Sequence, residues 1–70
     1  MNNPYPKEIR ELVVRAFGDP SSILTKLDGG YTPGEVCGDI QKEKENLTDE
    51  RKLYALAVMD WCKSERSNQN

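Results

Sequence analysis

The sequence predicts an all-α protein, a compact bundle of four short helices that forms one domain. Three observations indicate this fold: helix-start signals recur along the chain, apolar residues are spaced by three and four, and no window alternates like a strand. The 70 residues are enough for a single small domain. A composition of 36% hydrophobic and 31% charged residues is typical of a globular chain and not of a disordered one.

The first helix is predicted over residues 6–17, after a flexible arm of residues 1–5. Pro6 suits the first helical position, because the N–H that proline lacks would be unpaired there in any case. Gly18 is expected to end the helix in a left-handed cap. The apolar residues between them share one helical face: Ile9, Leu12, Val13, Ala16 and Phe17.

A second, shorter helix is predicted over residues 20–28. Asp19 is the expected N-cap and Pro20 the expected first residue. The Asp-Gly-Gly sequence at residues 28–30 is a strong stop signal. The apolar face of this helix consists of Ile23, Leu24 and Leu27.

The clearest helix start in the chain precedes the third helix, predicted over residues 33–45. Thr32 and Glu35 have the spacing of a capping box, and Pro33 occupies the first helical position between them. Three apolar residues form the stripe expected to be buried: Val36, Cys37 and Ile40.

Two glycines lie four residues apart on a flanking face of this third helix, at Gly34 and Gly38. Each costs about 1 kcal/mol in a helix interior relative to alanine. Close approach of another helix is the expected reason for both, and close approach of a ligand or a partner's backbone is the alternative.

The last helix, predicted over residues 48–64 with Thr48 as N-cap, is apolar on most of its surface. Nine of the ten residues from Leu53 to Cys62 are apolar, and Asp60 is the exception. A helical projection assigns the core face to Leu53, Tyr54, Ala57, Val58, Trp61 and Cys62. A narrow stripe remains on the other side, formed by Lys52, Leu56, Met59 and Lys63.

The predicted core draws on all four helices. It consists of Ile9, Leu12, Val13, Phe17, Ile23, Leu24, Leu27, Val36, Ile40, Leu47, Leu53, Tyr54, Ala57, Val58 and Trp61. Residues 66–70 are expected to be a flexible tail.

The stripe on the last helix is the best candidate for a functional surface, because burying one face leaves its apolar residues partly exposed. In one alternative, other helices of the chain cover the stripe, and it has no binding role. A homodimer is a further alternative, because a two-fold axis buries the stripe twice. The predicted partner-binding residues are Lys52, Leu56, Met59, Asp60 and Lys63.

Catalysis, a metal and a cofactor are not expected in this chain. It has no histidine, which removes the commonest general base and a common metal ligand. Its two cysteines, Cys37 and Cys62, form no metal-binding or redox motif. The start of the chain has no apolar run and no segment is long enough to span a membrane, so we expect a cytoplasmic protein with two free thiols.

Residues 23–40 contain a pattern that resembles helix-turn-helix domains: Ile23-Leu24-x-x-Leu27, a Gly-Gly-Tyr turn and then Thr-Pro-Gly-Glu-Val. The resemblance implies helix-turn-helix-like packing of the two middle helices and, as an alternative function, a DNA-binding transcription regulator. Residues 35–50 hold six acids and two lysines, however, and this charge repels phosphate.

The same acidic segment suggests a second alternative, mimicry of nucleic acid toward a basic partner. The secondary acidic surface would consist of Glu35, Asp39, Glu43 and Glu45. The leading hypothesis is a small non-enzymatic binding module that docks on a larger protein or protein complex and regulates or inhibits it, without contact with a membrane.

Overall fold

The computed structural model describes the chain from residue 5 to residue 68, and its side chains as far as residue 65. The described elements are α1 (Lys7–Phe17), α2 (Ser22–Asp28), α3 (Pro33–Glu43), a 3₁₀ turn η1 (Lys44–Asn46) and α4 (Asp49–Asn68). The predicted all-α bundle of four helices is therefore confirmed. The rest of the predicted arm and tail, residues 1–4 and 69–70, lies outside the described residues.

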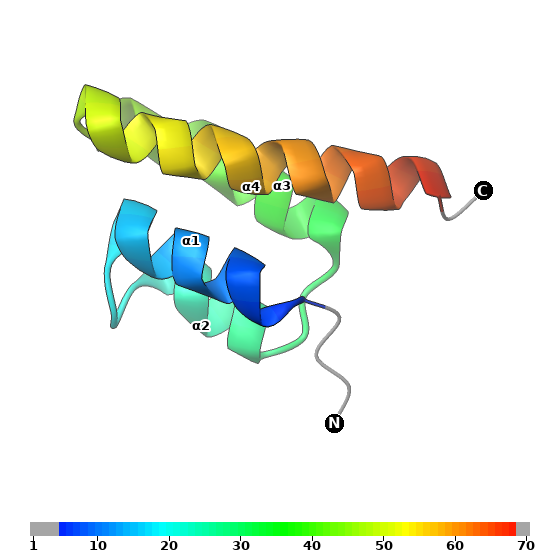
Figure 1. Ribbon diagram of the computed structural model, residues 1–70. Coiled ribbons are helices and arrows are strands. Elements are labelled where there is room, and N and C mark those ends of the chain that lie inside the picture. The colour runs from blue at the N-terminus through cyan, green and yellow to red at the C-terminus, as the bar shows by residue number, and fades with distance from the viewer. Residues whose placement is uncertain (1–4, 69–70) are drawn as a thin grey trace.

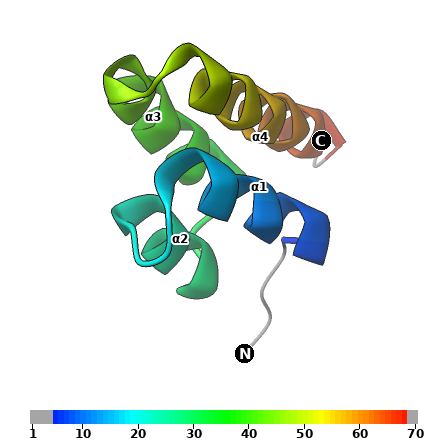
Figure 2. The same cartoon turned by 60° about the vertical axis from the view of Figure 1, so that its left-hand side comes forward.

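The four helices form a ring in which each contacts its neighbours in sequence and α4 closes the ring on α1. Figure 1 shows α4 lying along one side of the molecule, antiparallel to α1. Figure 2, seen more nearly along the helices, places α2 diagonally opposite α4. One side of α4 thus packs toward α1 and α3, and its other side faces away from the bundle.

Three of the helices begin at a hydroxyl N-cap: Ser21 before α2, Thr32 before α3 and Thr48 before α4. Each side-chain oxygen accepts a hydrogen bond from the backbone N–H three residues later, at 3.1, 3.3 and 3.3 Å. The predicted caps at Thr32 and Thr48 are confirmed. The second helix ends at residue 28 as predicted, but its predicted start is wrong, because Ser21 supplies the cap and leaves Asp19 and Pro20 before the helix.

The first helix begins one residue later than predicted. Pro6 has an extended backbone and acts as the N-cap, and its carbonyl accepts from the N–H groups of Ile9 and Arg10. Gly18 ends the helix as expected, with a φ of 97° that side chains disfavour, and its N–H donates to the Val14 carbonyl at 2.8 Å. Its ψ of 175° is extended, so the predicted left-handed helical cap is wrong in that detail. The last helix is one turn longer than predicted, since its backbone remains helical to Asn68.

All four helices contribute to the core, and most of the predicted core residues are confirmed. Those with no exposed surface include Val13, Ile23, Leu27, Val36, Ile40 and Val58. Leu12, Phe17, Leu47, Tyr54 and Trp61 are partly buried and pack against the core from its edges.

The core face of α4 differs from the predicted face by about one residue. Leu53 is 68% exposed and Ala57 is exposed, whereas Ala55 and Met59 are buried. Because α4 is apolar on most of its circumference, the apolar pattern alone does not set its rotation. Contact with two helices at once sets it, and the small side chain of Ala55 faces the packed interior.

Residue 5 is the one described residue of the predicted flexible arm, and it is anchored. The Tyr5 ring is buried against Trp61, with ring centroids 5.5 Å apart and planes inclined by 49°. Its hydroxyl donates to the backbone carbonyl of Tyr31, and burial raises the pKa of this hydroxyl. Tyr5 therefore ties the start of α1 both to α4 and to the loop before α3.

Polar contacts hold the short helix α2 between its neighbours. Arg10 on α1 donates two hydrogen bonds of 3.0 Å to the Asp28 carboxylate, and this pairing lowers the pKa of Asp28. On the other side the Lys26 ammonium contacts Asp39 of α3 at 2.5 Å. The bidentate geometry of the guanidinium adds directional specificity at the edge of the apolar contact.

The glycine pair in α3 does not reflect close approach of another helix at Gly38. Gly38 is exposed, and a Cβ added there would meet no atom within 4 Å, so this prediction is wrong at that position. Gly34 is half-buried. Nothing in the part of the chain that the structure describes explains the glycine at residue 38.

Gly38→Ala is expected to stabilise the fold by about 1 kcal/mol, because it adds helix propensity without a steric conflict. For a domain of this size that corresponds to a rise in Tm of about 4–8 °C, measured by thermal circular dichroism. Gly18→Ala is the matched control and should destabilise, because alanine disfavours the φ of 97°. A loss of stability in the Gly38 variant would mean that the site is packed.

Candidate functional site

The side of α4 that faces away from the bundle carries an exposed apolar patch with charges around it. We call it the α4 outer face; it comprises Asp49, Leu53, Leu56, Ala57, Asp60 and Lys63, all of which are exposed. Leu53 and Leu56 are 68% and 48% exposed and lie less than one turn apart. Tyr31 is the other large hydrophobic residue that is exposed among residues 5–65.

Four of the five predicted partner-binding residues lie on or beside this face. Leu56, Asp60 and Lys63 are exposed members of it, and Lys52 is half-buried at its edge. Met59 is only 5% exposed and belongs to the core, so its assignment to a binding surface is wrong. The buried arc of α4 is wide because it serves two neighbours, and this arc includes Met59.

Leu53 is the surface residue that the sequence prediction missed, since it was assigned to the core. A signal for its exposure exists in the polar residues of α4. Leu53 lies four residues after Asp49 and seven before Asp60, spacings that put all three on one side of a helix. The two carboxylates mark the solvent side more reliably than the apolar residues mark the core.

The four carboxylates of the predicted acidic surface do not form one free patch. Asp39 is engaged by Lys26, and Glu43 accepts from the Ser22 hydroxyl at 3.0 and 3.2 Å. Both contacts join α3 to α2 and so belong to the fold. Glu35 and Glu45 remain exposed, at opposite ends of the segment.

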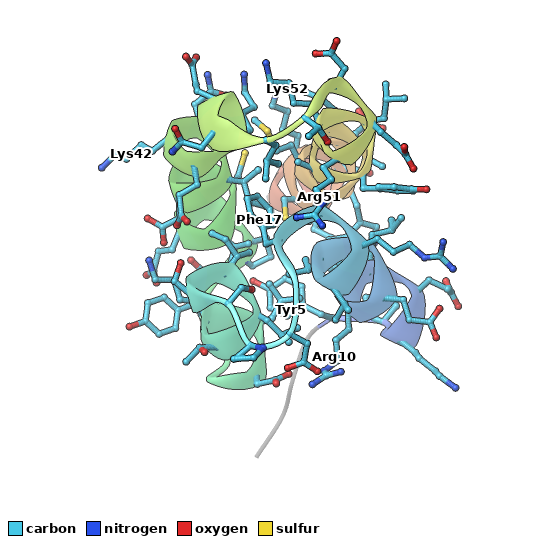
Figure 3. All side chains as sticks on the ribbon, turned by 90° about the vertical axis from the view of Figure 1, so that its left-hand side faces the viewer. Tyr5, Arg10, Phe17, Lys42, Arg51 and Lys52 are labelled. Atoms are coloured by element: carbon cyan, nitrogen blue, oxygen red, sulfur yellow. The ribbon has the colours of Figure 1, made fainter. Side chains whose placement is uncertain are left out.

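The outward face of α3 is the surface that a helix-turn-helix protein would use to read DNA. Its exposed residues are Glu35, Gly38, Gln41 and Lys42. In Figure 3 Lys42 points away from the other helices. With one carboxylate for its one cation, this face lacks the cluster of basic side chains that phosphate contact requires.

The two cysteines are buried and their thiols are free, as predicted. Burial raises the pKa of Cys62 to about 12, and the nearby Cys37 and Glu65 add to the shift. The Cys62 thiol is therefore neutral over the physiological range and a poor nucleophile.

A metal site and a membrane-spanning helix are both absent from the described residues. None of their histidine, cysteine, aspartate and glutamate side chains form a group of three or more that could hold a metal ion. None of their helices is long and apolar enough to cross a membrane.

Comparisons of the chain with protein-family models, with curated proteins and with solved structures gave no match. Among the described surfaces, the α4 outer face is the most distinctive, because it exposes two large apolar side chains.

Met59→Asp and Leu56→Asp test the orientation of α4 directly. Met59→Asp puts an unpaired carboxylate in the core, which should cost more than about 3 kcal/mol and leave the chain largely unfolded. Leu56→Asp changes an exposed position and should cost less than about 1 kcal/mol. Urea titration followed by far-UV circular dichroism at low protein concentration measures both; equal losses would contradict the described rotation of α4.

The Cys62 thiol should react with a chromogenic disulfide reagent only when the chain unfolds. At a pH of about 8, a pKa of about 12 leaves roughly one thiol in ten thousand ionised, and burial blocks access besides. The Cys37→Ala variant reports on Cys62 alone. We expect slow reaction in buffer and rapid, stoichiometric reaction in urea; rapid reaction of the folded variant would place Cys62 at the surface.

Proposed function

We propose that this protein is a small binding module that docks on a larger protein partner through the α4 outer face and regulates or inhibits that partner. The observation that carries the proposal is the exposure of Leu53 and Leu56, neighbours on a helix whose opposite side organises the core. Small domains have little apolar surface to spare for their own stability, so two exposed leucines side by side call for a reason.

The layout of the face supports protein docking more than a small-molecule site. Leu53, Leu56 and Ala57 form an apolar centre on the regular surface of a long helix. Asp60 and Lys63 lie next to them as polar neighbours. An apolar centre with a polar rim is the usual anatomy of a protein interface, and a helix face suits a groove or a second helix on the partner.

A comparison of captured proteins tests the proposal. The wild-type chain and the Leu53→Asp/Leu56→Asp variant are immobilised and exposed to extract of the organism that encodes the chain. We expect a specific partner on the wild type that is lost on the folded double variant. Lys42→Asp serves as control because it changes an exposed charge on α3, away from α4.

The salt dependence of capture separates this proposal from acidic mimicry. Docking through leucines should persist at an ionic strength of about 1 M, where the Debye length falls to about 3 Å. Capture that collapses with salt and survives the double variant would move the interface to the acidic residues. Capture that is unchanged by either treatment would exclude the α4 outer face.

A further inference from the structure

Five residues along α4 form a stripe whose spacing is symmetric about its centre. They are Asp49, Lys52, Leu56, Asp60 and Lys63, separated by three, four, four and three residues. Steps of three and four keep residues on one side of a helix, so the stripe runs straight along α4. Four of its members are exposed and Lys52 is half-buried.

The charges along this stripe change sign when its direction is reversed. From Leu56 toward the start of the helix the stripe has a cation at Lys52 and then an anion at Asp49. From Leu56 toward the end it has an anion at Asp60 and then a cation at Lys63. The spacings are the same in both directions, so the stripe is complementary to its own reversed copy.

We propose that the partner of this stripe is a second copy of the chain, paired antiparallel along α4 about a two-fold axis that passes beside Leu56. In this arrangement Lys52 of each copy faces Asp60 of the other, and the two Leu56 side chains meet at the axis. Asp49 likewise faces Lys63. Four opposite-charge pairs thus flank an apolar centre, as an isologous interface requires.

The charges also disfavour a parallel pairing of the two copies of α4. A parallel pair in register places Asp49 against Asp49 and Lys52 against Lys52, so each charged residue of the stripe faces its like. Like charges in close contact are unfavourable, and discrimination of this kind specifies orientation between paired helices. The stripe therefore selects the antiparallel arrangement.

Within residues 5–65, nothing covers this surface, so a second copy can approach it. Figure 1 shows α4 on one edge of the molecule, with α1 and α2 to one side of it and α3 behind it, and the end of α4 projects past them. Leu53 and Ala57 are exposed beside the stripe and gain cover in the dimer. Only one helix per copy pairs, so the interface is small and its expected Kd lies between about 1 µM and 1 mM.

This inference rests on the proposed function for the choice of surface and adds a regulatory consequence. The dimer covers Leu53 and Leu56, which a larger partner would need. The dimer therefore cannot bind a larger partner through this face, and the monomer is the form that binds. Partner capture should fall as the concentration of the chain rises past the Kd of the dimer.

Sedimentation equilibrium of the wild-type chain from about 1 µM to 1 mM gives the first test. We expect a monomer at the low end and a dimer at the high end, with association weakened by added salt. A monomer throughout this range would overturn the proposal. It would leave the proposed function standing, because capture of a partner by the monomer is measured separately.

Charge reversal tests the antiparallel register. Lys52→Asp sets two pairs of carboxylates against each other, and Asp60→Lys sets two pairs of ammonium groups against each other. Each variant alone should dimerise at least about tenfold more weakly than the wild type. An equal mixture of the two should recover the dimer, because the reversed residues then face opposite charges in both pairs.

Two further variants complete the design. Lys52→Asp/Asp60→Lys restores both pairs within one chain and should dimerise like the wild type. Lys42→Asp changes the net charge by the same amount as Lys52→Asp, but it lies on α3, off the stripe, and should leave dimerisation unaltered. Wild-type association of either single variant, or a mixture that stays monomeric, would overturn the pairing. Recovery in the mixture also shows that both single variants are folded.

Discussion

The structure depends on burying one face of α4 against two helices at once. Ala55, Val58, Met59 and Cys62 form this face, and α1 and α3 meet it from two sides. α4 is the longest helix among the described residues, and it closes the ring by packing against both α1 and α3. Because a core of this size supplies only about 3–5 kcal/mol, loss of this contact is sufficient to unfold the domain.

The remaining interactions adjust this arrangement. Tyr5 packs on Trp61 and bonds to the loop before α3, so residues outside the helices add to the core. The pairs Arg10–Asp28 and Lys26–Asp39 orient the short helix α2, whose apolar face alone is narrow. With α4 held on one side, its opposite side is free to carry Leu53 and Leu56 toward solvent, where a partner or a second copy can use them.

Helix positions were predictable from local chemistry, whereas the rotation of the last helix was not. The caps at Thr32 and Thr48 act through their own backbone neighbours, so short sequence patterns reveal them. The rotation of α4 depends on residues far away in sequence, and the apolar residues between Leu53 and Cys62 do not distinguish its sides. The carboxylates of Asp49 and Asp60 mark the exposed side, but apolar spacing alone does not use them. This is why Leu53 was assigned to the core and Met59 to the surface, while Leu56, Asp60 and Lys63 were placed correctly on the exposed side.

The rotation of α4 turns Ala55, and not Ala57, into the core, and one matched pair of substitutions tests this rotation. Ala55 has no exposed surface and Ala57 is exposed, two residues along the same helix. Ala55→Leu should overpack the interior and cost about 1–3 kcal/mol, while Ala57→Leu should change the free energy of unfolding by less than about 0.5 kcal/mol. Urea unfolding of both variants at a concentration of a few micromolar measures the difference. The reverse order, with Ala57→Leu the damaging change, would show that Ala57, and not Ala55, faces the core.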